Sequence, residues 1–355
     1  MFARSKLGAG DWVEVRSKAE ILATLDANGR LENLPFMPEM FEHCGRRFRV
    51  WKRAHKTCDT VNKTGGRRVS DAVHLENVRC SGKSHGGCEA ACLLFWNEAW
   101  LKRVDGSGPT LRPLGQTGSG CDESTVFAAA QGPGSSAEDP TYVCQATLLP
   151  QFSSPLAWWD FRQYVDDYRW GNVTLDQLLS GAAYVLFLAL AKPGQRIRRR
   201  LSPALIRLYD RWQSLRGGVP FPRRSGTIPP GEKTPSPPSL NLQPGEWVRV
   251  KAYPEILATL DTNNMNRGLY FDAEEVPYCG GTYRVRSRVS KIIDEKTGKM
   301  RPLKSGVVIL EGVYCQARYS DKRMFCPRAI YPFWRDVWLE RAQPPSGQNQ
   351  TTVTR

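Results

Sequence analysis

Alternating hydrophobic and polar positions mark several short β-strands along the chain. WVEV at residues 12–15 and WVRV at residues 247–250 alternate as half-buried strands do. EILATLD follows soon after each of them and places Ile21, Leu22 and Leu25 at helical spacing, which predicts a short helix. FRVWKR, YRVRSRV, VHLENV and VVILEGV predict further strands, and DEKTGKM predicts a hairpin turn in the second half of the chain.

The pattern occurs twice because the chain contains an internal duplication. GDWVEVRSKAEILATLD at residues 10–26 returns as GEWVRVKAYPEILATLD at residues 245–261, an offset of 235 residues. This offset pairs Glu39 with Glu274, Cys44 with Cys279 and Cys80 with Cys315. After a three-residue insertion it becomes 238 and pairs Cys88 with Cys326. We expect two β-rich repeats, at residues 10–103 and 245–341. Each ends in FWxxxWL, and we expect its two tryptophans to lie on a helical face or as aromatic residues at a rim.

The remaining segments differ in composition from the repeats. Residues 104–140 are rich in Gly, Ser, Thr and Pro and are expected to form a flexible insertion. Residues 141–216 predict a helical, basic middle segment. The proline-rich residues 217–244 are typical of a semi-extended linker, and residues 342–355 of a polar tail.

These elements predict a mainly β protein with α segments, an α+β fold, in which two small barrels are joined by the helical basic segment. The sequence PGEWVRVK, which opens the second repeat, resembles the first strand of SH3-like barrels, including KOW-type modules. The resemblance implies tandem SH3-like barrels. The whole pattern also resembles an uncharacterised family of bacterial proteins, through the blocks at residues 266–285 and 325–341, and this resemblance implies no activity.

Composition and chain start bear on the class of protein. The 355 residues are 41% hydrophobic and 24% charged, values typical of globular domains. The start lacks the apolar region of a secretory signal, and the longest apolar stretch, Leu178–Ala191, has 14 residues where a spanning helix needs roughly 20. We therefore expect a cytoplasmic protein with no spanning membrane segment. Its ten cysteines then favour metal ligands or reactive thiols over disulfides.

The cysteines form a repeated set whose chemistry suits a metal. Thiolate sulfur and neutral imidazole bind soft and borderline ions, and zinc takes four such ligands. In the first repeat they would be Cys44, Cys80 and Cys88 with one of Cys58, Cys92 or His85. The second repeat offers Cys279, Cys315 and Cys326, with a fourth ligand from Cys121, Cys144 or solvent. A site of three cysteines would also suit an iron–sulfur cluster. The alternative is that these thiols fill the cores.

Two further kinds of function stay open. Cys88 or Cys92 could pair with His85 or His74 as an enzyme's nucleophile and base, with the active site in the first repeat. Residues 192–224 carry ten of the basic residues and one aspartate, in a chain of net charge +15. That segment could bind a polyanion, either nucleic acid or an anionic membrane surface, or be a solvated helix face. Its candidate contacts are Arg196, Arg198, Arg199, Arg200, Arg207 and Arg211.

The leading hypothesis is a cysteine-ligated metal-binding protein that acts as a binding or scaffold module, and such a module would have a protein partner. Structural zinc is the first choice of cofactor and an iron–sulfur cluster the second. The enzyme and the nonspecific nucleic-acid or anionic-surface binder are the alternatives.

Overall fold

The computed structural model describes residues 6–104, 121–191, 196–236, 238–320 and 322–345, and only the backbone at 190, 191, 196–202, 304 and 305. The chain divides into two compact units. Unit 1 contains residues up to 178 together with 291–303 and 322–330, and unit 2 contains 179–290, 304–321 and the residues from 331 onward. Two short segments of the second repeat therefore belong to the unit that holds the first repeat.

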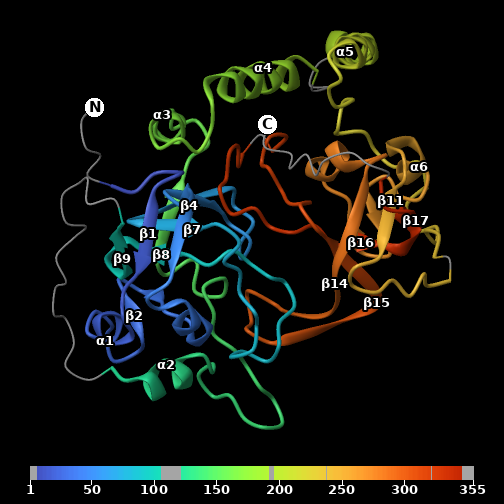
Figure 1. Ribbon diagram of the computed structural model, residues 1–355. Helices are drawn as coiled ribbons and strands as arrows, with labels where there is room; N and C mark the ends of the chain where they lie inside the picture. Colours follow the sequence, from blue (N-terminus) through green and yellow to red (C-terminus); the bar gives the residue numbers. More distant parts are fainter. Residues whose placement is uncertain (1–5, 105–120, 192–195, 237, 321, 346–355) are drawn as a thin grey trace. The chain divides into compact units, whose positions relative to one another are not determined.

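The first repeat is built from short strands and short helices, as Figure 1 shows. In order these are β1 (Trp12–Val15), α1 (Lys18–Leu22), β2 (Arg30–Leu31), β3 (Leu34–Pro35), the 3-10 helix η1 (Pro38–His43), β4 (Arg47–Arg53), β5 (Lys56–Cys58), β6 (Gly66–Val69), β7 (Ala72–Leu75), β8 (Trp96–Asn97), the 3-10 helix η2 (Glu98–Trp100) and β9 (Leu101–Arg103).

The second repeat has the same order of elements, except that β14 and β15 are long and form the predicted hairpin (Figure 1). Its elements are β11 (Trp247–Val250), α6 (Tyr253–Leu257), β12 (Met265–Asn266), β13 (Leu269–Tyr270), the 3-10 helix η3 (Ala273–Tyr278), β14 (Thr282–Ile293), β15 (Met300–Leu310), β16 (Trp334–Arg335), the 3-10 helix η4 (Asp336–Trp338) and β17 (Leu339–Arg341). Asp294 begins the turn by accepting the N–H groups of Lys296 and Thr297, and Gly298 has a φ of +71°.

Each repeat contains one five-stranded sheet whose registers are antiparallel. The strand orders are β8-β7-β4-β1-β9 and β16-β15-β14-β11-β17. The first strand of each repeat therefore pairs with the fourth strand, β4 or β14, and with the last strand, β9 or β17. Val13 lies opposite Phe48 and Arg103, and the equivalent Val248 lies opposite Tyr283 and Arg341. A three-stranded sheet in the order β10-β6-β5, in which β10 is Ser153–Leu156, and two two-stranded pairs complete the described strands. None of these described sheets closes a barrel. The expected α+β fold class is confirmed, and its sheets are mostly antiparallel.

Local chemistry explains the short helices that EILATLD predicted. Ser17 caps α1, because its Oγ accepts the N–H of Glu20 at 3.3 Å while the Glu20 carboxylate accepts the Ser17 N–H at 2.9 Å. The second repeat has Ala252 at the cap, and only the bond from its N–H to Glu255 is made, at 2.8 Å. The helix survives this loss because Ile256 and Leu257 are buried in the core.

The tryptophans of FWxxxWL form the centre of each core. Trp96 and Trp100 are fully buried in the first repeat, as Trp334 and Trp338 are in the second, so the expected helical face or rim position is wrong. The reason is that β8 and η2, like β16 and η4, direct both rings inward. The Trp100 indole N–H donates to Thr24 Oγ1 at 3.1 Å and that of Trp338 to Thr259 Oγ1 at 3.0 Å, so the second tryptophan of each repeat has its buried donor satisfied.

The middle of the chain adds helices and one strand. They are α2 (Glu123–Ala129), β10 (Ser153–Leu156), α3 (Arg162–Arg169), α4 (Leu175–Ala191) and α5 (Arg196–Leu215). β10 pairs with β6, and residues 105–120 of the insertion lie outside the described residues. None of the described helices combines the length and the apolar character that crossing a bilayer requires.

Candidate metal centre

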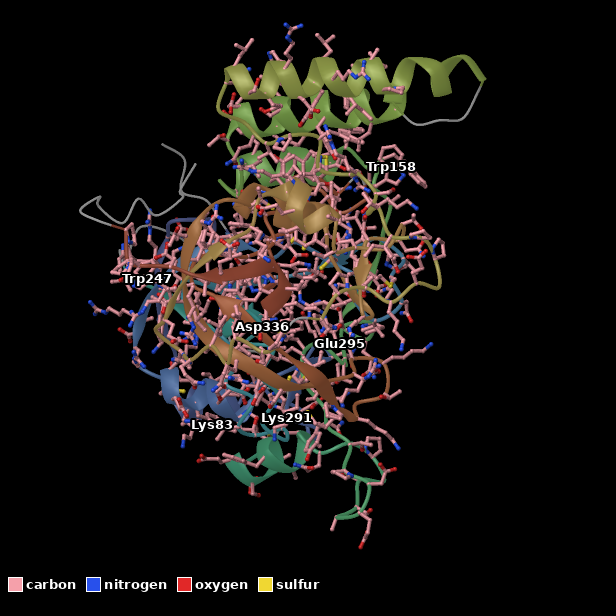
Figure 2. All side chains as sticks on the ribbon, turned by 90° about the vertical axis from the view of Figure 1, so that its right-hand side faces the viewer. Lys83, Trp158, Trp247, Lys291, Glu295 and Asp336 are labelled. Atoms are coloured by element: carbon pink, nitrogen blue, oxygen red, sulfur yellow. The ribbon has the colours of Figure 1, made fainter. Side chains whose placement is uncertain are left out.

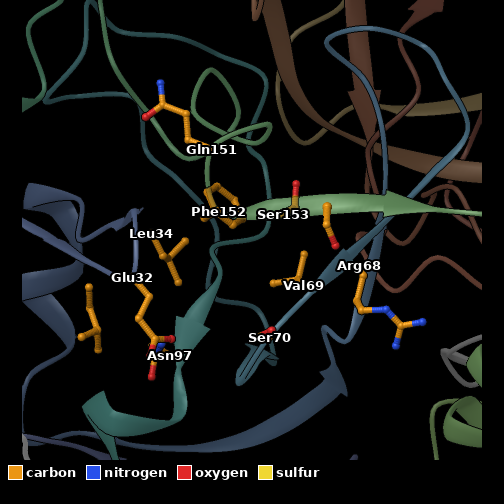
Figure 3. A pocket seen from close by; sticks show the side chains of 11 residues that line it. Glu32, Leu34, Arg68, Val69, Ser70, Asn97, Gln151, Phe152 and Ser153 are labelled. Carbon is orange, nitrogen blue, oxygen red and sulfur yellow. The ribbon is translucent and has the colours of Figure 1, made fainter.

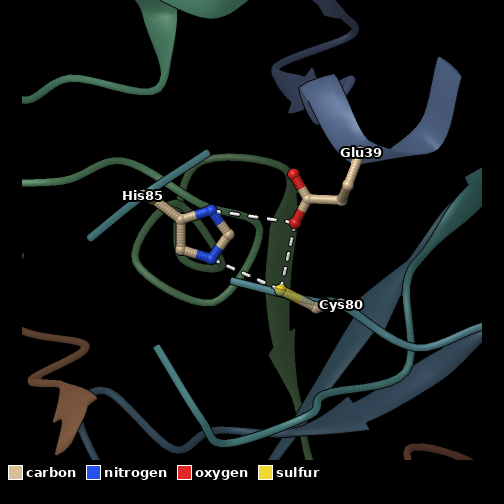
Figure 4. Close-up of side chains that lie close together, drawn as sticks. All are labelled: Glu39, Cys80 and His85. Atoms are coloured by element: carbon tan, nitrogen blue, oxygen red, sulfur yellow. Dashed lines mark hydrogen bonds and ion pairs between the residues drawn. The ribbon is translucent and has the colours of Figure 1, made fainter. Parts of the chain in front are cut away.

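A carboxylate, a thiol and an imidazole meet inside unit 1 (Figure 4). Cys80 Sγ lies 3.1 Å from Glu39 Oε1 and 3.3 Å from His85 Nε2, and His85 Nδ1 lies 3.7 Å from the same carboxylate oxygen. All three ligand atoms are within 4.8 Å of one another. Among the described residues this is the only group of three such side chains with that spacing.

Three separate segments position these side chains. Glu39 lies in the first turn of η1, which begins at Pro38. Cys80 follows β7, and its backbone N–H donates to Cys92 O at 2.8 Å, which closes the loop between them. His85 lies in that loop, where its N–H donates to Gly82 O at 3.1 Å.

The shape of this loop requires glycine at residue 82 and at residues 86 and 87, the two glycines of HGGC. Gly82, Gly86 and Gly87 all have φ between 71° and 73°, a region that L side chains rarely adopt. A Cβ at Gly82 would lie 2.0 Å from Cys88 O, and one at Gly86 would lie 2.6 Å from the Tyr142 ring. Glycine at these three positions thus allows the chain to bend tightly enough to bring the His85 ring to Cys80.

Burial dominates the electrostatics of the group. Glu39 and His85 are 6% and 1% exposed, and Cys80 is partly buried. Burial and the Glu39 carboxylate raise the pKa of Cys80 well above its usual value, whereas burial lowers the pKa of His85. Ser84 Oγ contacts Glu39 Oε2 and lies 3.0 Å from His85 Nδ1. The imidazole is therefore neutral at pH 7, the form in which it binds metal.

The group can hold a metal ion. Cys80 and His85 were among the ligands predicted from sequence, whereas Glu39 was not. The signal that could have found Glu39 is the duplication, because Glu39 recurs as Glu274. Sequence reasoning counted only sulfur and nitrogen ligands and so passed over a repeated, buried carboxylate.

Three more of the cysteines that the sequence offered as metal ligands lie close to Cys80 and His85. Cys88, Cys92 and Cys144 line a cavity of about 40 Å³ together with Cys80 and His85. Burial raises the pKa of Cys92 to about 11 and that of Cys144 to about 12, so both thiols are protonated at neutral pH.

Cys58 and Cys326 form a separate pair in unit 1. The Cys58 N–H donates to Cys326 Sγ at 3.2 Å, and hydrogen bonding between the two thiols, with burial, raises the pKa of Cys58. Both side chains are buried. The equivalent contact joins Ile293 N–H to Cys88 Sγ at 3.4 Å. Ile293 replaces Cys58 in the second repeat, so only one of the two contacts is a thiol pair.

The other predicted cysteines lie elsewhere. Cys44 packs against the core of the first repeat, and Cys279 against that of the second, where burial raises its pKa to about 12. Cys315 is partly buried in unit 2. Near it, Glu274 accepts backbone N–H groups from Arg318 and Tyr319 at 3.0 and 2.5 Å. Glu274 thus has backbone donors where Glu39 has a thiol and an imidazole.

His74, considered as a catalytic base, is fully buried and separate from the group. Its Nδ1 lies 2.9 Å from Leu94 O and its ring lies 4.6 Å from that of Phe95. Burial lowers its pKa to about 3, so it is a neutral core residue.

The predicted polyanion contacts are described only in part. Arg207 and Arg211 are exposed on α5. The side chains of Arg196, Arg198, Arg199 and Arg200 lie outside the described residues.

Unit 1 also contains a larger, open pocket of about 270 Å³ (Figure 3). Its walls include Leu34, Arg68, Asn97 and Phe152. Asn97 uses its side-chain oxygen to accept the Ala99 N–H at 2.9 Å, so that oxygen caps η2. No buried charged group converges on this pocket among its lining residues, and its lining does not specify a ligand.

Comparison with known proteins adds no family to this geometry. The chain matches no protein-family model and no curated protein. The function is therefore argued from the site itself.

Proposed function

We propose that this is a metal-binding protein whose ion is held in the first repeat by Glu39, Cys80 and His85. The observation that carries the proposal is the approach of Cys80 Sγ to both Glu39 Oε1 and His85 Nε2, at 3.1 and 3.3 Å, inside a buried site. A buried carboxylate beside a thiol is costly unless a cation or a shared proton compensates it. A divalent ion would balance one carboxylate and one thiolate and leave the site neutral.

Zinc is the ion that this ligand set favours. Thiolate, imidazole and carboxylate are all zinc ligands, and three protein ligands leave a fourth position for water. An iron–sulfur cluster is less well supported, because its usual ligands are several thiolates and the group contains only one. Zinc would bind Cys80 as the thiolate, so it would have to displace the proton that burial and the Glu39 carboxylate favour on this thiol by raising its pKa.

Elemental analysis and cobalt substitution test the proposal. We expect about one zinc per chain, and replacement by Co²⁺ should give thiolate-to-cobalt charge-transfer absorption. Cys80→Ser should remove that band, while His85→Gln and Glu39→Gln should each weaken Co²⁺ binding by about tenfold or more.

The matched control is Cys121→Ser. Cys121 is partly exposed in the same unit, and its thiol lies 3.7 Å from the neighbouring Asp122 O and is not part of the Glu39, Cys80 and His85 group. Binding should be unchanged in this variant. Equal Co²⁺ affinity in the parent, Cys80→Ser and His85→Gln, each shown to be folded by circular dichroism, would contradict the site.

An enzyme with its active site in the first repeat is the second candidate. The contact of Cys80 with His85, which itself lies beside Glu39, has the connectivity of a nucleophile, a base and an orienting acid. However, Cys80 also contacts Glu39 directly, and its pKa is raised rather than lowered. A ready nucleophile needs the opposite shift, so the geometry favours the metal.

The SH3-like interpretation of the repeats belongs to this proposal as its scaffold. It is supported by the strand order in each sheet. It is also supported by the 3-10 helix between the last two strands of each repeat, η2 between β8 and β9 and η4 between β16 and β17. In this scaffold the loop of residues 80–92, here called the metal loop, is part of the connection between β7 and β8. It therefore leaves the five-stranded sheet intact.

A further inference from the structure

Helix α5 carries apolar side chains on two separate faces. Ile206 and Tyr209 face inward and pack on a small cluster formed by Tyr184, Leu188 and Phe221 of unit 2. Leu208, Trp212 and Leu215 follow one another at i, i+4 and i+7 and therefore share a second face. Their exposed fractions are 65%, 49% and 85%, so packing among the described residues does not account for them.

Cationic side chains flank this outer stripe on both sides. Arg207 and Arg211 are exposed along one edge, and Arg216, just after the helix, lies on the other, with its guanidinium carbon 5.0 Å from the Trp212 ring centre. The single acidic residue of the described helix, Asp210, is paired with Arg224. An apolar stripe with arginine on its borders is the pattern of a helix lying in a bilayer interface, where guanidinium groups reach lipid phosphates.

Helix α4 shows the same exposure on its unit 2 portion. Tyr184 and Leu188 are its buried side, and Phe187 stacks on Tyr209 of α5 at 4.8 Å. Leu179 and Leu186, seven residues apart and so on one face, are each 63% exposed. No charged residue occurs between residues 177 and 191. The outer faces of both helices are therefore apolar.

We propose that α5, assisted by the exposed face of α4 from Leu179 onward, docks on an anionic lipid surface. The argument for this occupant is the combination of an exposed apolar stripe with charge: residues 192–224 carry ten basic residues and one acidic residue. Nucleic acid would use the arginines but would leave Leu208 and Leu215 without a role. A bilayer uses both, because acyl chains receive the leucines while anionic headgroups attract the arginines.

Vesicle sedimentation with the full-length protein tests this docking. The probes are phosphatidylcholine vesicles with and without phosphatidylserine. We expect binding that depends on phosphatidylserine and falls with salt. The double variant Trp212→Ser and Leu215→Ser should bind about tenfold more weakly or worse, because both side chains insert. The triple variant Arg207→Gln, Arg211→Gln and Arg216→Gln should lose the preference for phosphatidylserine.

Tyr270→Ser is the matched control. Tyr270 is 48% exposed in the same unit, about as much as Trp212, and lies on the short strand β13. Its substitution should leave vesicle binding unchanged. All of the variants change exposed side chains, so circular dichroism and metal content should match those of the parent protein.

Three results would overturn the proposal. Absence of binding to either kind of vesicle is the first. The second is retention on single-stranded RNA that the arginine variant loses and the serine variant keeps, without vesicle binding, which would assign the helix to nucleic acid. The third is a dimer in light scattering that the serine variant converts to monomer, again without vesicle binding, which would assign the stripe to a second copy of the chain.

Discussion

The duplicated glutamates show how one residue acquires two roles. Glu39 and Glu274 occupy equivalent positions in η1 and η3, and both are buried. Glu274 accepts two backbone N–H groups from the loop after Cys315, whereas Glu39 faces Cys80 and His85. The difference arises in the loop, because the first repeat has HGGC where the second has no histidine. Sequence alone identifies the equivalence, but not which neighbours each carboxylate meets.

We therefore expect opposite outcomes from the same substitution in the two repeats. Glu274→Gln replaces one accepting oxygen with an N–H₂ group opposite a backbone donor, so it should lower the free energy of unfolding by about 1–3 kcal/mol. Metal content should stay the same. Glu39→Gln should weaken metal binding instead. Urea denaturation and metal titration of both variants check this, and a loss of metal from Glu274→Gln would show that the division of roles is wrong.

His74 gives the protein a pH-dependent stability. Burial, with smaller contributions from Arg328, Arg79 and Lys52, lowers its pKa to about 3. In the unfolded chain this imidazole binds a proton below about pH 6.5, whereas in the folded chain it does so only below about pH 3. The free energy of unfolding is therefore highest above about pH 6.5 and decreases as the pH falls from about 6.5 to about 3. The loss from this residue should be about 1.4 kcal/mol per pH unit.

The variant His74→Gln isolates this contribution. We expect the free energy of unfolding, measured with urea, to fall between about pH 6.5 and about pH 5. The fall should be roughly 2 kcal/mol larger in the parent than in the variant. His55, whose pKa burial also lowers to about 3, is unchanged in both proteins and so cancels in the comparison. Identical pH dependence in parent and variant would contradict the assignment of a neutral core histidine.

At the scale of elements, the repeats exchange contacts around equivalent residues. Cys326 Sγ receives the N–H of Cys58, and Cys88 Sγ receives that of Ile293, the counterpart of Cys58. Thr60 hydrogen-bonds to its own counterpart, Glu295. The hairpin tip 291–303 and the segment 322–330 thus meet the first repeat within unit 1, in the region where Figure 2 labels Lys291 and Glu295.

Arg328 joins the first repeat to the hairpin tip, and we expect its substitution to lower the free energy of unfolding strongly. It is 1% exposed, donates to Thr60 Oγ1 at 2.7 Å and lies 3.3 Å from Glu295. Arg328→Met leaves Glu295 without its cation, and because that carboxylate is a quarter exposed we expect the low end of the usual penalty, about 3 kcal/mol. The measurement is urea denaturation.

The control is Arg301→Met on the same hairpin. Arg301 pairs with Asp294 at 3.1 Å, but its side chain is 69% exposed, so its loss should cost about 0–1 kcal/mol. Similar costs for the two arginines would mean that the buried pair does not stabilise the junction.

The sequence predicted the elements better than their partners. Strands β1 and β11, the helices after them and the 294–300 turn follow from periodicity and turn chemistry, which are local. The ends of the repeats were misjudged, because an FWxxxWL pattern is equally compatible with a helix surface and with a strand that turns into a 3-10 helix. Cys80 and His85 are close in sequence and were found, whereas Glu39 meets them only through tertiary packing.

For the whole molecule, the repeats and the compact units do not coincide. The hairpin tip is attached to unit 1 by backbone bonds: Glu89 N–H donates to Lys291 O at 3.1 Å, and Tyr142 N–H to Gly298 O at 2.8 Å. With the Cys88 and Cys326 contacts, these bonds complete the same region that contains the metal loop. A chain that ended before the second repeat would expose the apolar and thiol groups that these segments cover.

Separate expression of the two parts tests this dependence. Residues 1–190 alone should fail to unfold cooperatively and should bind Co²⁺ weakly, because segments 291–303 and 322–330 are missing. Adding residues 217–355 should restore both properties and yield a complex that co-purifies. The control is the full chain cut within the proline-rich linker, which keeps every segment and should stay assembled. Cooperative unfolding and tight Co²⁺ binding by residues 1–190 alone would mean that the first repeat is self-sufficient and that the exchanged contacts are incidental to its fold.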